Sequence, residues 1–275
     1  MKIITLLEND ACRTGLTSAR GLSLYVETAK HKLLFDMGPD AHFLDNARAL
    51  GVDLSAVDIA VLSHGHSDHG GGLASFCREN SQAAVYLRPE ALQPYYAVLP
   101  GKDPQFIGLE TPPDFIQKRL ALTESTLRLD EELLLFSDVE DDKSLRAVAP
   151  KLQRKAGPDF LPDGFAHEQH LLVEEDGKAV LLAGCGHLGI VNTLWAAERH
   201  LGRMPDAVFG GFHLFELEPG NPDAERLISV TAQALGRGDT VYYTGHCTGE
   251  WAYARLQESL GDRLRPMHCG TTAEL

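Results

Sequence analysis

The sequence lacks several features that would assign it to other classes of protein. No apolar run approaches the ~20 residues of a membrane span, and Met1 leads directly into a predicted strand, Lys2 to Glu8, instead of a signal sequence. Basic residues are scarce: 25 lysines and arginines face 39 acidic residues, which leaves a net charge of −14. We therefore expect a cytoplasmic protein without a nucleic-acid or membrane-surface partner.

Cysteine pairs and nucleotide-binding loops are also missing. The five cysteines are an odd number without the regular spacing of a disulfide framework, so we expect reduced thiols. No GxSxG, Walker-type or Rossmann-type glycine loop is present, and Gly70–Gly72 lacks the lysine of a phosphate-binding loop. The 275 residues, 44% of them hydrophobic, are enough for one large α/β domain.

Histidine and aspartate are concentrated in the stretch Ser63 to Leu73, which follows the apolar run Ile59 to Leu62. Because this run is short and apolar, we predict a central strand there, with a loop after it. A loop leaving a strand end can fold all of its polar side chains inward, whereas a helix would scatter them. Imidazole and carboxylate donors without a thiolate pair suit zinc, manganese or iron. The four candidate ligands are His64, His66, Asp68 and His69.

The second half of the chain repeats one pattern, in which an apolar strand is followed by small residues and then a histidine. His187 follows the run 179–183, His213 follows 207–209, and His246 follows 240–243. Neighbouring strands in layered α/β folds place such loops at one edge of a sheet. We therefore expect a site assembled from sequence-distant loops.

The order H-x-H-x-D-H at residues 64–69 resembles the signature loop of the metallo-β-lactamase-fold superfamily, and Leu34–Gly38 resembles its LFDxG segment. The motifs GCGH, GGFHL and TGHCTG around His187, His213 and His246 resemble the branch that contains the archaeal dihydropterin–aminobenzene phosphate synthases of methanopterin biosynthesis. The resemblance implies an α/β fold, an αββα sandwich, as a single domain over residues 1–275.

The resemblance also implies two divalent metal ions, most simply zinc, with manganese or iron as alternatives. His64, His66 and His187 would hold one ion, and the second would be held by Asp68, His69 and His246. His246 resembles the last metal ligand of the superfamily; the alternative is a helix-capping residue before Glu250. Cys185 occupies the place of a metal-bridging aspartate in many relatives, and it either supplies a thiolate or is a small buried residue.

Other polar residues have alternative interpretations. His213 is interpreted as contacting the substrate or the metal-bound water, with a histidine at the core edge as the alternative. His167, Glu168 and His170 are the candidates for a missing third ligand. A proline-rich, lid-like insertion is expected at about 89–165, since six of the 14 prolines lie between Pro89 and Pro113. This segment is either a lid or an oligomer contact, so a homo-oligomer is compatible with the sequence.

The expected activity is metal-dependent hydrolysis of a small anionic substrate, a phosphoester or a pyrophosphate-type compound. A water shared by two metal ions would be the nucleophile, and Asp68 would orient it. The alternative is a transferase of the methanopterin-synthase type, in which an arylamine displaces pyrophosphate from a pterin-like substrate. A weaker alternative is a metal-binding sensor without turnover.

Overall fold

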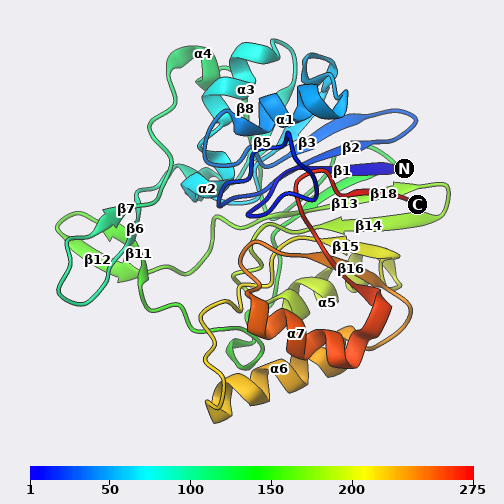
Figure 1. The fold of residues 1–275 in the computed structure, drawn as a ribbon. Helices are drawn as coiled ribbons and strands as arrows, with labels where there is room; N and C mark the ends of the chain where they lie inside the picture. Colours follow the sequence, from blue (N-terminus) through cyan, green and yellow to red (C-terminus); the bar gives the residue numbers. More distant parts are fainter. The chain divides into compact units, whose positions relative to one another are not determined.

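The computed structural model describes residues 1–275, which divide into two units, each built around its own seven-stranded sheet. The first unit comprises Met1–Glu124, Ala149–Gln169 and His268–Leu275, and the second comprises Ser125–Val148 and His170–Met267. Figure 1 labels their helices and strands. None of the helices is both long enough and apolar enough to span a membrane.

The sheet of the first unit combines an antiparallel and a parallel part. Strands β1, β2 and β3 are antiparallel, and β3, β4, β5 and β8 run parallel. In sheet order the strands are β18 (Thr272–Glu274), β1 (Lys2–Leu7), β2 (Ser23–Glu27), β3 (Lys32–Phe35), β4 (Ile59–Val61), β5 (Ala84–Leu87) and β8 (Leu120–Leu122).

Two amphipathic helices, α1 (His42–Leu50) and α3 (Leu73–Glu79), pack on this sheet. Phe43 of α1 and Phe76 of α3 are fully buried in one cluster with strand residues such as Leu34. Helix α1 ends at Gly51, which adopts φ 73°, a left-handed conformation that suits glycine. The short helices are α2 (Ser67–Gly70) and α4 (Asp114–Gln117), with 3-10 turns η1 (Leu54–Ala56) and η2 (Pro89–Leu92).

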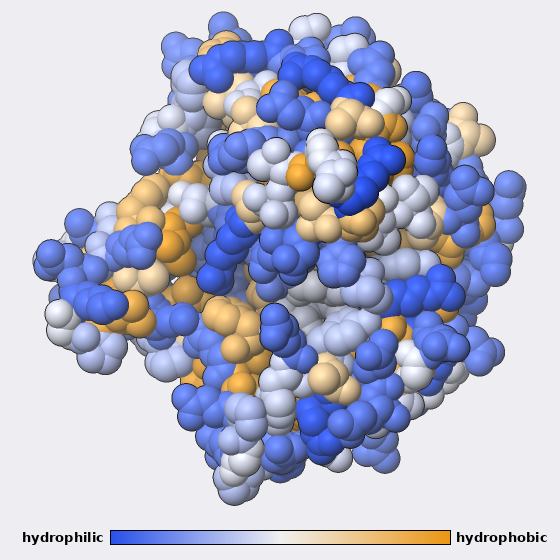
Figure 2. Space-filling view, in the orientation of Figure 1, coloured by the Kyte–Doolittle hydropathy of each residue, from blue (hydrophilic) through white to orange (hydrophobic).

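A small four-stranded sheet also belongs to the first unit. Its strands, in sheet order, are β12 (Asp159–Pro162), β11 (Leu152–Ala156), β6 (Tyr95–Ala97) and β7 (Gln105–Phe106). Apolar residues reach its surface, as the orange areas over these strands in Figure 2 show, and Phe106 and Leu161 are 37% and 43% exposed. The segment 89–165 supplies strands to this sheet, to the first large sheet through β8 and to the second through β9 and β10.

The second unit has a sheet in which β14, β15, β16 and the edge strand β17 are parallel, while β13 and β10 are antiparallel neighbours. In sheet order the strands are β17 (Leu264–Pro266), β16 (Val241–Thr244), β15 (Ala207–Phe209), β14 (Lys178–Leu182), β13 (His170–Glu175), β10 (Leu133–Phe136) and β9 (Thr126–Arg128). The 3-10 turns are η3 (Lys143–Leu145) and η4 (Gly261–Arg263).

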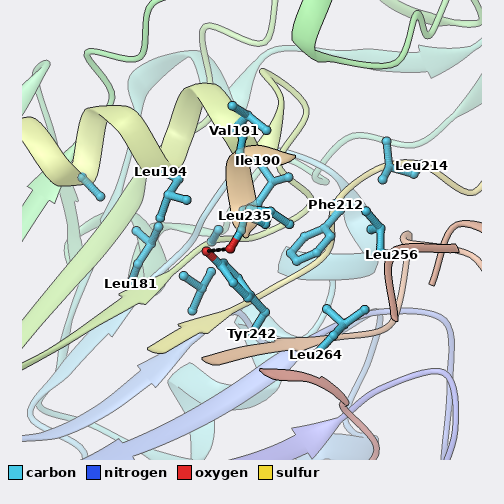
Figure 3. Packing of buried hydrophobic residues seen from close by; sticks show 14 of the residues in the cluster. Leu181, Ile190, Val191, Leu194, Phe212, Leu214, Leu235, Tyr242, Leu256 and Leu264 are labelled. Atoms are coloured by element: carbon cyan, nitrogen blue, oxygen red, sulfur yellow. Dashed lines mark hydrogen bonds between the residues drawn. The ribbon is translucent and has the colours of Figure 1, made fainter. Parts of the chain in front are cut away.

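Three helices cover one face of this sheet: α5 (Ile190–Leu201), α6 (Pro222–Leu235) and α7 (Glu250–Leu260). Leu194, Leu235 and Leu256, one from each helix, are buried in the same cluster as the strand residues Leu181 and Tyr242 (Figure 3). The Tyr242 hydroxyl donates a hydrogen bond of 3.0 Å to the Leu235 carbonyl, so the one polar atom of this ring is satisfied inside the core.

Candidate metal centre

The histidine-rich stretch lies at the carboxyl end of the parallel strands β3 and β4, at one edge of the first sheet. His64 lies in a bend after β4, His66 has extended backbone, and the helical turn α2 begins only at Ser67, with His66 at its N-cap. Asp68 and His69 therefore lie in a helical turn, which corrects the prediction of a loop for all four residues. A longer helix would point the four side chains in different directions. Here the turn starts after the first two histidines, so the four side chains can still face one another.

These side chains converge. The ligand atoms of His64, Asp68 and His69 all lie within 4.8 Å of one another. The ring centroid of His64 is 4.2 Å from that of His69 and 4.7 Å from that of His66. His64 and His69 are fully buried and His66 is 5% exposed. So dense a group of buried imidazoles and a carboxylate fits the donor set of a divalent metal ion.

Asp36, at the end of β3, organises two of these histidines. Its carboxylate accepts hydrogen bonds from the Ser63 N–H and from the Ser63 hydroxyl, both at 2.7 Å, and it lies 2.7 Å from His69 Nδ1. Since a carboxylate only accepts, His69 carries its proton on Nδ1. The Ser63 oxygen in turn lies 2.7 Å from His64 Nδ1. Nε2 is therefore the nitrogen that His64 and His69 would offer to a metal.

A second carboxylate, Asp163, approaches the third histidine. Its Oδ2 lies 3.6 Å from His66 Nε2 and 3.0 Å from His167 Nε2. The Gly65 N–H donates to His167 Nδ1 at 2.9 Å, so His167 is the Nε2–H tautomer and donates to Asp163. With both nitrogens of His167 engaged, this residue is poorly suited to be the missing third ligand.

The charges of this pair follow from their surroundings. Burial would raise the pKa of the Asp163 carboxyl, but the contacts with His167 and His66 outweigh burial and lower that pKa well below its usual value. Burial lowers the pKa of His167, against the opposing effect of Asp163. Asp163 is thus an anion beside a neutral His167.

Sequence reasoning missed the roles of Asp36 and Asp163. Asp36 was visible only as the aspartate of the LFDMG segment, and its φ of 60° marks an unusual backbone for a non-glycine residue. Asp163 lies in the stretch Leu99 to Phe165, where nothing in the sequence pointed to the site. His170, also considered as a third ligand, is buried on β13 with its ring 5.2 Å from that of Phe136, and burial lowers its pKa to about 3.

The second unit carries the other candidate residues at one edge of its own sheet. Strands β14, β15 and β16 are parallel neighbours, and His187, His213 and His246 follow their carboxyl ends, as the sequence predicted. The rings of His187 and His213 lie 4.2 Å apart. The ligand atom of Cys185 lies within 4.8 Å of those of both His187 and His246, so Cys185 is a buried neighbour of both.

The loops of the second unit are held mainly by their backbone. His213 and His246 adopt φ values of 48° and 44°, which non-glycine residues seldom do. The Leu214 N–H donates to the Cys247 carbonyl at 3.0 Å and the Cys247 thiol donates to the Cys185 carbonyl at 3.4 Å. A Cβ at Gly211 would lie 2.3 Å from Cys247 Sγ, so only glycine fits there without movement.

The six predicted metal ligands thus belong to two sets. His64, His66, Asp68 and His69 lie in the first unit, and His187 and His246 lie in the second, where His213 and Cys185 accompany them. Arg20 Nε lies 3.8 Å from Asp68 Oδ2 in the first unit. Each set presents donors that suit zinc, manganese or iron, and thiolate from Cys185 would favour zinc among these.

Comparisons with known proteins show which family the chain resembles over most of its length. The family model of the metallo-beta-lactamase superfamily matches residues 18–246. The chain is 27% identical to the 7,8-dihydropterin-6-methyl-4-(beta-D-ribofuranosyl)-aminobenzene-5'-phosphate synthase of Methanocaldococcus jannaschii, over 98% of this chain and 95% of that protein. These matches confirm the resemblance stated from the sequence.

Solved structures confirm the predicted fold. The crystal structure of Tm1679, described as a metal-dependent hydrolase of the beta-lactamase superfamily, has a TM-score of 0.82 at 25% identity and covers 100% of this chain and 99% of its own. Zn²⁺-bound PqqB from Methylobacterium extorquens has a TM-score of 0.55 at 14% identity and covers 100% of both chains. The second likeness concerns the fold alone.

Proposed function

The chain belongs to the metallo-β-lactamase superfamily, and on this premise we propose that it is an enzyme that uses two divalent metal ions. The ligands would be the six residues predicted from the sequence, in two sets of three: His64, His66 and His187, and then Asp68, His69 and His246. The observation that carries the proposal is the buried group of His64, Asp68 and His69, whose ligand atoms lie within 4.8 Å of one another.

The chain's own residues prepare this site for metal. Asp36 fixes the tautomer of His69 through Nδ1, and the Ser63 hydroxyl, itself bonded to Asp36, does the same for His64. Bound divalent ions would neutralise negative charge on a phosphate-type group and make a water more acidic. Asp68 would orient the attacking group as well as bind metal, and His213 would contact the substrate.

The substrate class that suits such a site is a small anion, a phosphoester or a pyrophosphate-type compound. We propose hydrolysis as the reaction, because it requires only water beside the substrate. The whole-length similarity to Tm1679, described as a metal-dependent hydrolase, supports this choice. Zinc is the metal we propose first, and manganese and iron fit the same oxygen and nitrogen donors.

A second candidate reaction is favoured by a different observation. The 27% identity to the archaeal synthase extends over 98% of this chain, so its resemblance is not limited to the metal-binding motifs. In a reaction of that type an arylamine displaces pyrophosphate from a pterin-like substrate. The protein would then have to hold a second organic molecule and exclude water from the site.

One assay separates the two reactions. The metal-loaded protein is given a pterin-methyl pyrophosphate with and without an arylamine acceptor, and both pyrophosphate release and coupled product are followed. Hydrolysis predicts release without the acceptor, and transfer predicts that the acceptor is required and appears in the product. A metal-loaded protein that acts neither on this pair nor on an activated aryl phosphodiester would contradict both reactions.

A further inference from the structure

We propose that Asp163 is a positioning residue for the metal ligand His66, which it holds with the proton on Nε2 so that Nδ1 is the nitrogen presented to a metal ion. The inference rests on the proposed metal-binding role of His66. It gives a positioning role to Asp163, a residue of the 89–165 segment that the sequence did not connect with the metal ligands. Asp163 itself would not touch metal or substrate.

The contact is buried and specific. Asp163 Oδ2 lies 3.6 Å from His66 Nε2, and the side chains of His66 and Asp163 are only 6% and 3% exposed. The same oxygen accepts the hydrogen bond from His167 Nε2 at 3.0 Å. The other oxygen, Oδ1, accepts the Phe165 N–H at 2.8 Å. Water competes weakly for a carboxylate that is so well covered, so His167, His66 and this N–H are the neighbours that act on it.

The direction of the neighbouring hydrogen bonds fixes the protons. The Gly65 N–H can only donate, so His167 Nδ1 is an acceptor and His167 Nε2 carries the hydrogen that points at Asp163. An ionised carboxylate has no hydrogen of its own to give. The favourable state of His66 beside it is therefore the one with a hydrogen on Nε2, which makes Nδ1 the basic nitrogen.

The arrangement complements that of the other two histidines of the loop. His64 and His69 have their Nδ1 atoms 2.7 Å from Ser63 and Asp36, which reserves Nε2 for a metal. On His66 it is the opposite nitrogen, Nε2, that faces a carboxylate oxygen, at 3.6 Å, which is longer than a hydrogen bond. Each histidine thus has one nitrogen directed to a protein oxygen, the arrangement by which outer partners orient metal-binding imidazoles.

Contacts from the segment of Asp163, from β6 and from the stretch after β7 surround the histidine loop and Asp163. The Gln169 N–H donates to the Ser63 carbonyl at 2.7 Å, and the Tyr95 ring lies 4.1 Å from the His167 ring and 5.7 Å from the His66 ring. The Ser67 N–H donates to the Ile107 carbonyl at 2.8 Å, which attaches the stretch after β7 to the start of α2. These contacts preorganise the carboxylate before any metal binds.

An alternative role is a separate metal site, because the ligand atoms of His66, Asp163 and His167 lie within 4.8 Å of one another. The hydrogen bonds argue against it. His167 Nδ1 already accepts the Gly65 N–H, and its Nε2 would have to lose the hydrogen that it donates to Asp163. The experiment below distinguishes the two roles.

The test compares the wild-type protein with Asp163→Asn, Asp163→Glu and a control, Asp159→Asn, which changes an exposed aspartate of the same strand region. In metal-free, ¹⁵N-histidine-labelled protein, nitrogen chemical shifts report the His66 tautomer. In zinc-loaded protein, competition with a chelator reports zinc affinity. We expect Asp163→Asn to mix the His66 tautomers and to weaken zinc binding by about 10- to 100-fold. Asp163→Glu should keep most of the wild-type tautomer preference and zinc affinity. Asp159→Asn should change neither the tautomer nor the affinity.

The outcomes are separable. An unchanged His66 tautomer in a folded Asp163→Asn protein, with unchanged zinc affinity, would overturn the positioning role. Loss of a third equivalent of zinc in that variant would overturn it in favour of a separate metal site. A wild-type protein that binds no zinc would reject the proposed function, and the tautomer measured without metal would still decide whether Asp163 fixes His66. If Asp163→Asn does not fold, the same readouts on Asp163→Glu and wild type decide, since a fixed Nε2–H tautomer is expected in both.

Discussion

The two regions that carry the candidate ligands hold their side chains by different means. In the first unit each histidine of the loop faces an oxygen of another side chain. His64 faces Ser63, and His69 faces Asp36. His66 faces Asp163. In the second unit the loops depend more on backbone geometry, with positive φ at His213 and His246 and a close approach of Gly211 to Cys247. The histidine loop of the first unit should therefore be destabilised by loss of a carboxylate. The loops of the second unit should be destabilised by a larger side chain at Gly211.

The largest effect is expected from Asp36→Ala. The substitution leaves the Ser63 N–H, the Ser63 hydroxyl and His69 Nδ1 without their buried acceptor, and each such loss costs about 1–3 kcal/mol. We expect the free energy of unfolding to fall by roughly 3 kcal/mol or more, with loss of bound metal, measured by urea unfolding and elemental analysis. The matched control is Asp45→Ala on α1, an exposed residue whose ion pair with Arg48 should contribute less than about 1 kcal/mol. Similar losses in both variants would contradict the organising role of Asp36.

The next effect separates roles within the loop. His66→Ala and His69→Ala should lose metal and activity together, because each removes a ligand. Asp68→Asn should keep much of the metal at one site and lose turnover by more than about 100-fold, beyond the usual effect of losing an outer partner. Metal content and phosphodiesterase rates of the three variants provide the test. Equal metal and equal activity in all three would show that this loop does not form the site.

The sequence predicted those strands that have a clear hydrophobic pattern and missed those that have none. Short buried runs such as Ile59–Val61 and Ala207–Phe209 are apolar throughout and are followed by glycine or serine and then histidine, so both the strands and the clustering of the histidines within each unit could be predicted. In contrast, β12 has no buried residue and β7 has only two residues, both exposed. Such strands carry no periodic signal, and Asp163 reaches His66 only through tertiary contacts.

A smaller effect probes the second region. In Gly211→Ala the new Cβ would lie 2.3 Å from Cys247 Sγ, so the two loops must shift apart. We expect the free energy of unfolding to fall by about 1–3 kcal/mol, the usual cost of overpacking. Removing the sulfur in the double variant Gly211→Ala, Cys247→Ala should recover part of that loss, and a double-mutant cycle measures the recovery. Strict additivity of the two substitutions would argue that the close approach is unimportant.

At neutral pH the smallest effect is that of His170, whose contribution to stability changes only as the pH falls. Burial lowers the pKa of His170 to about 3 in the folded protein, against an ordinary value near 6.5. Below about pH 6.5 the unfolded chain binds a proton at this residue that the folded protein does not, so stability falls as the pH drops from about 6.5 toward 3, by up to about 1.4 kcal/mol per pH unit. In His170→Leu the change in the free energy of unfolding with pH that is due to His170 should vanish. Unfolding of the metal-free protein at several pH values would show this. Identical slopes for the variant and the wild type would contradict a neutral, buried His170.

The central claim is that the ligands of both regions serve two metal ions, and metal content tests it most directly. Elemental analysis of wild-type protein purified without chelator, beside His69→Ala and His246→Ala, addresses one ligand from each unit. We predict nearly two equivalents of divalent metal in the wild type and a clear loss in both variants. No more than trace metal in the wild type, even after reconstitution with zinc, manganese or iron, would contradict the account.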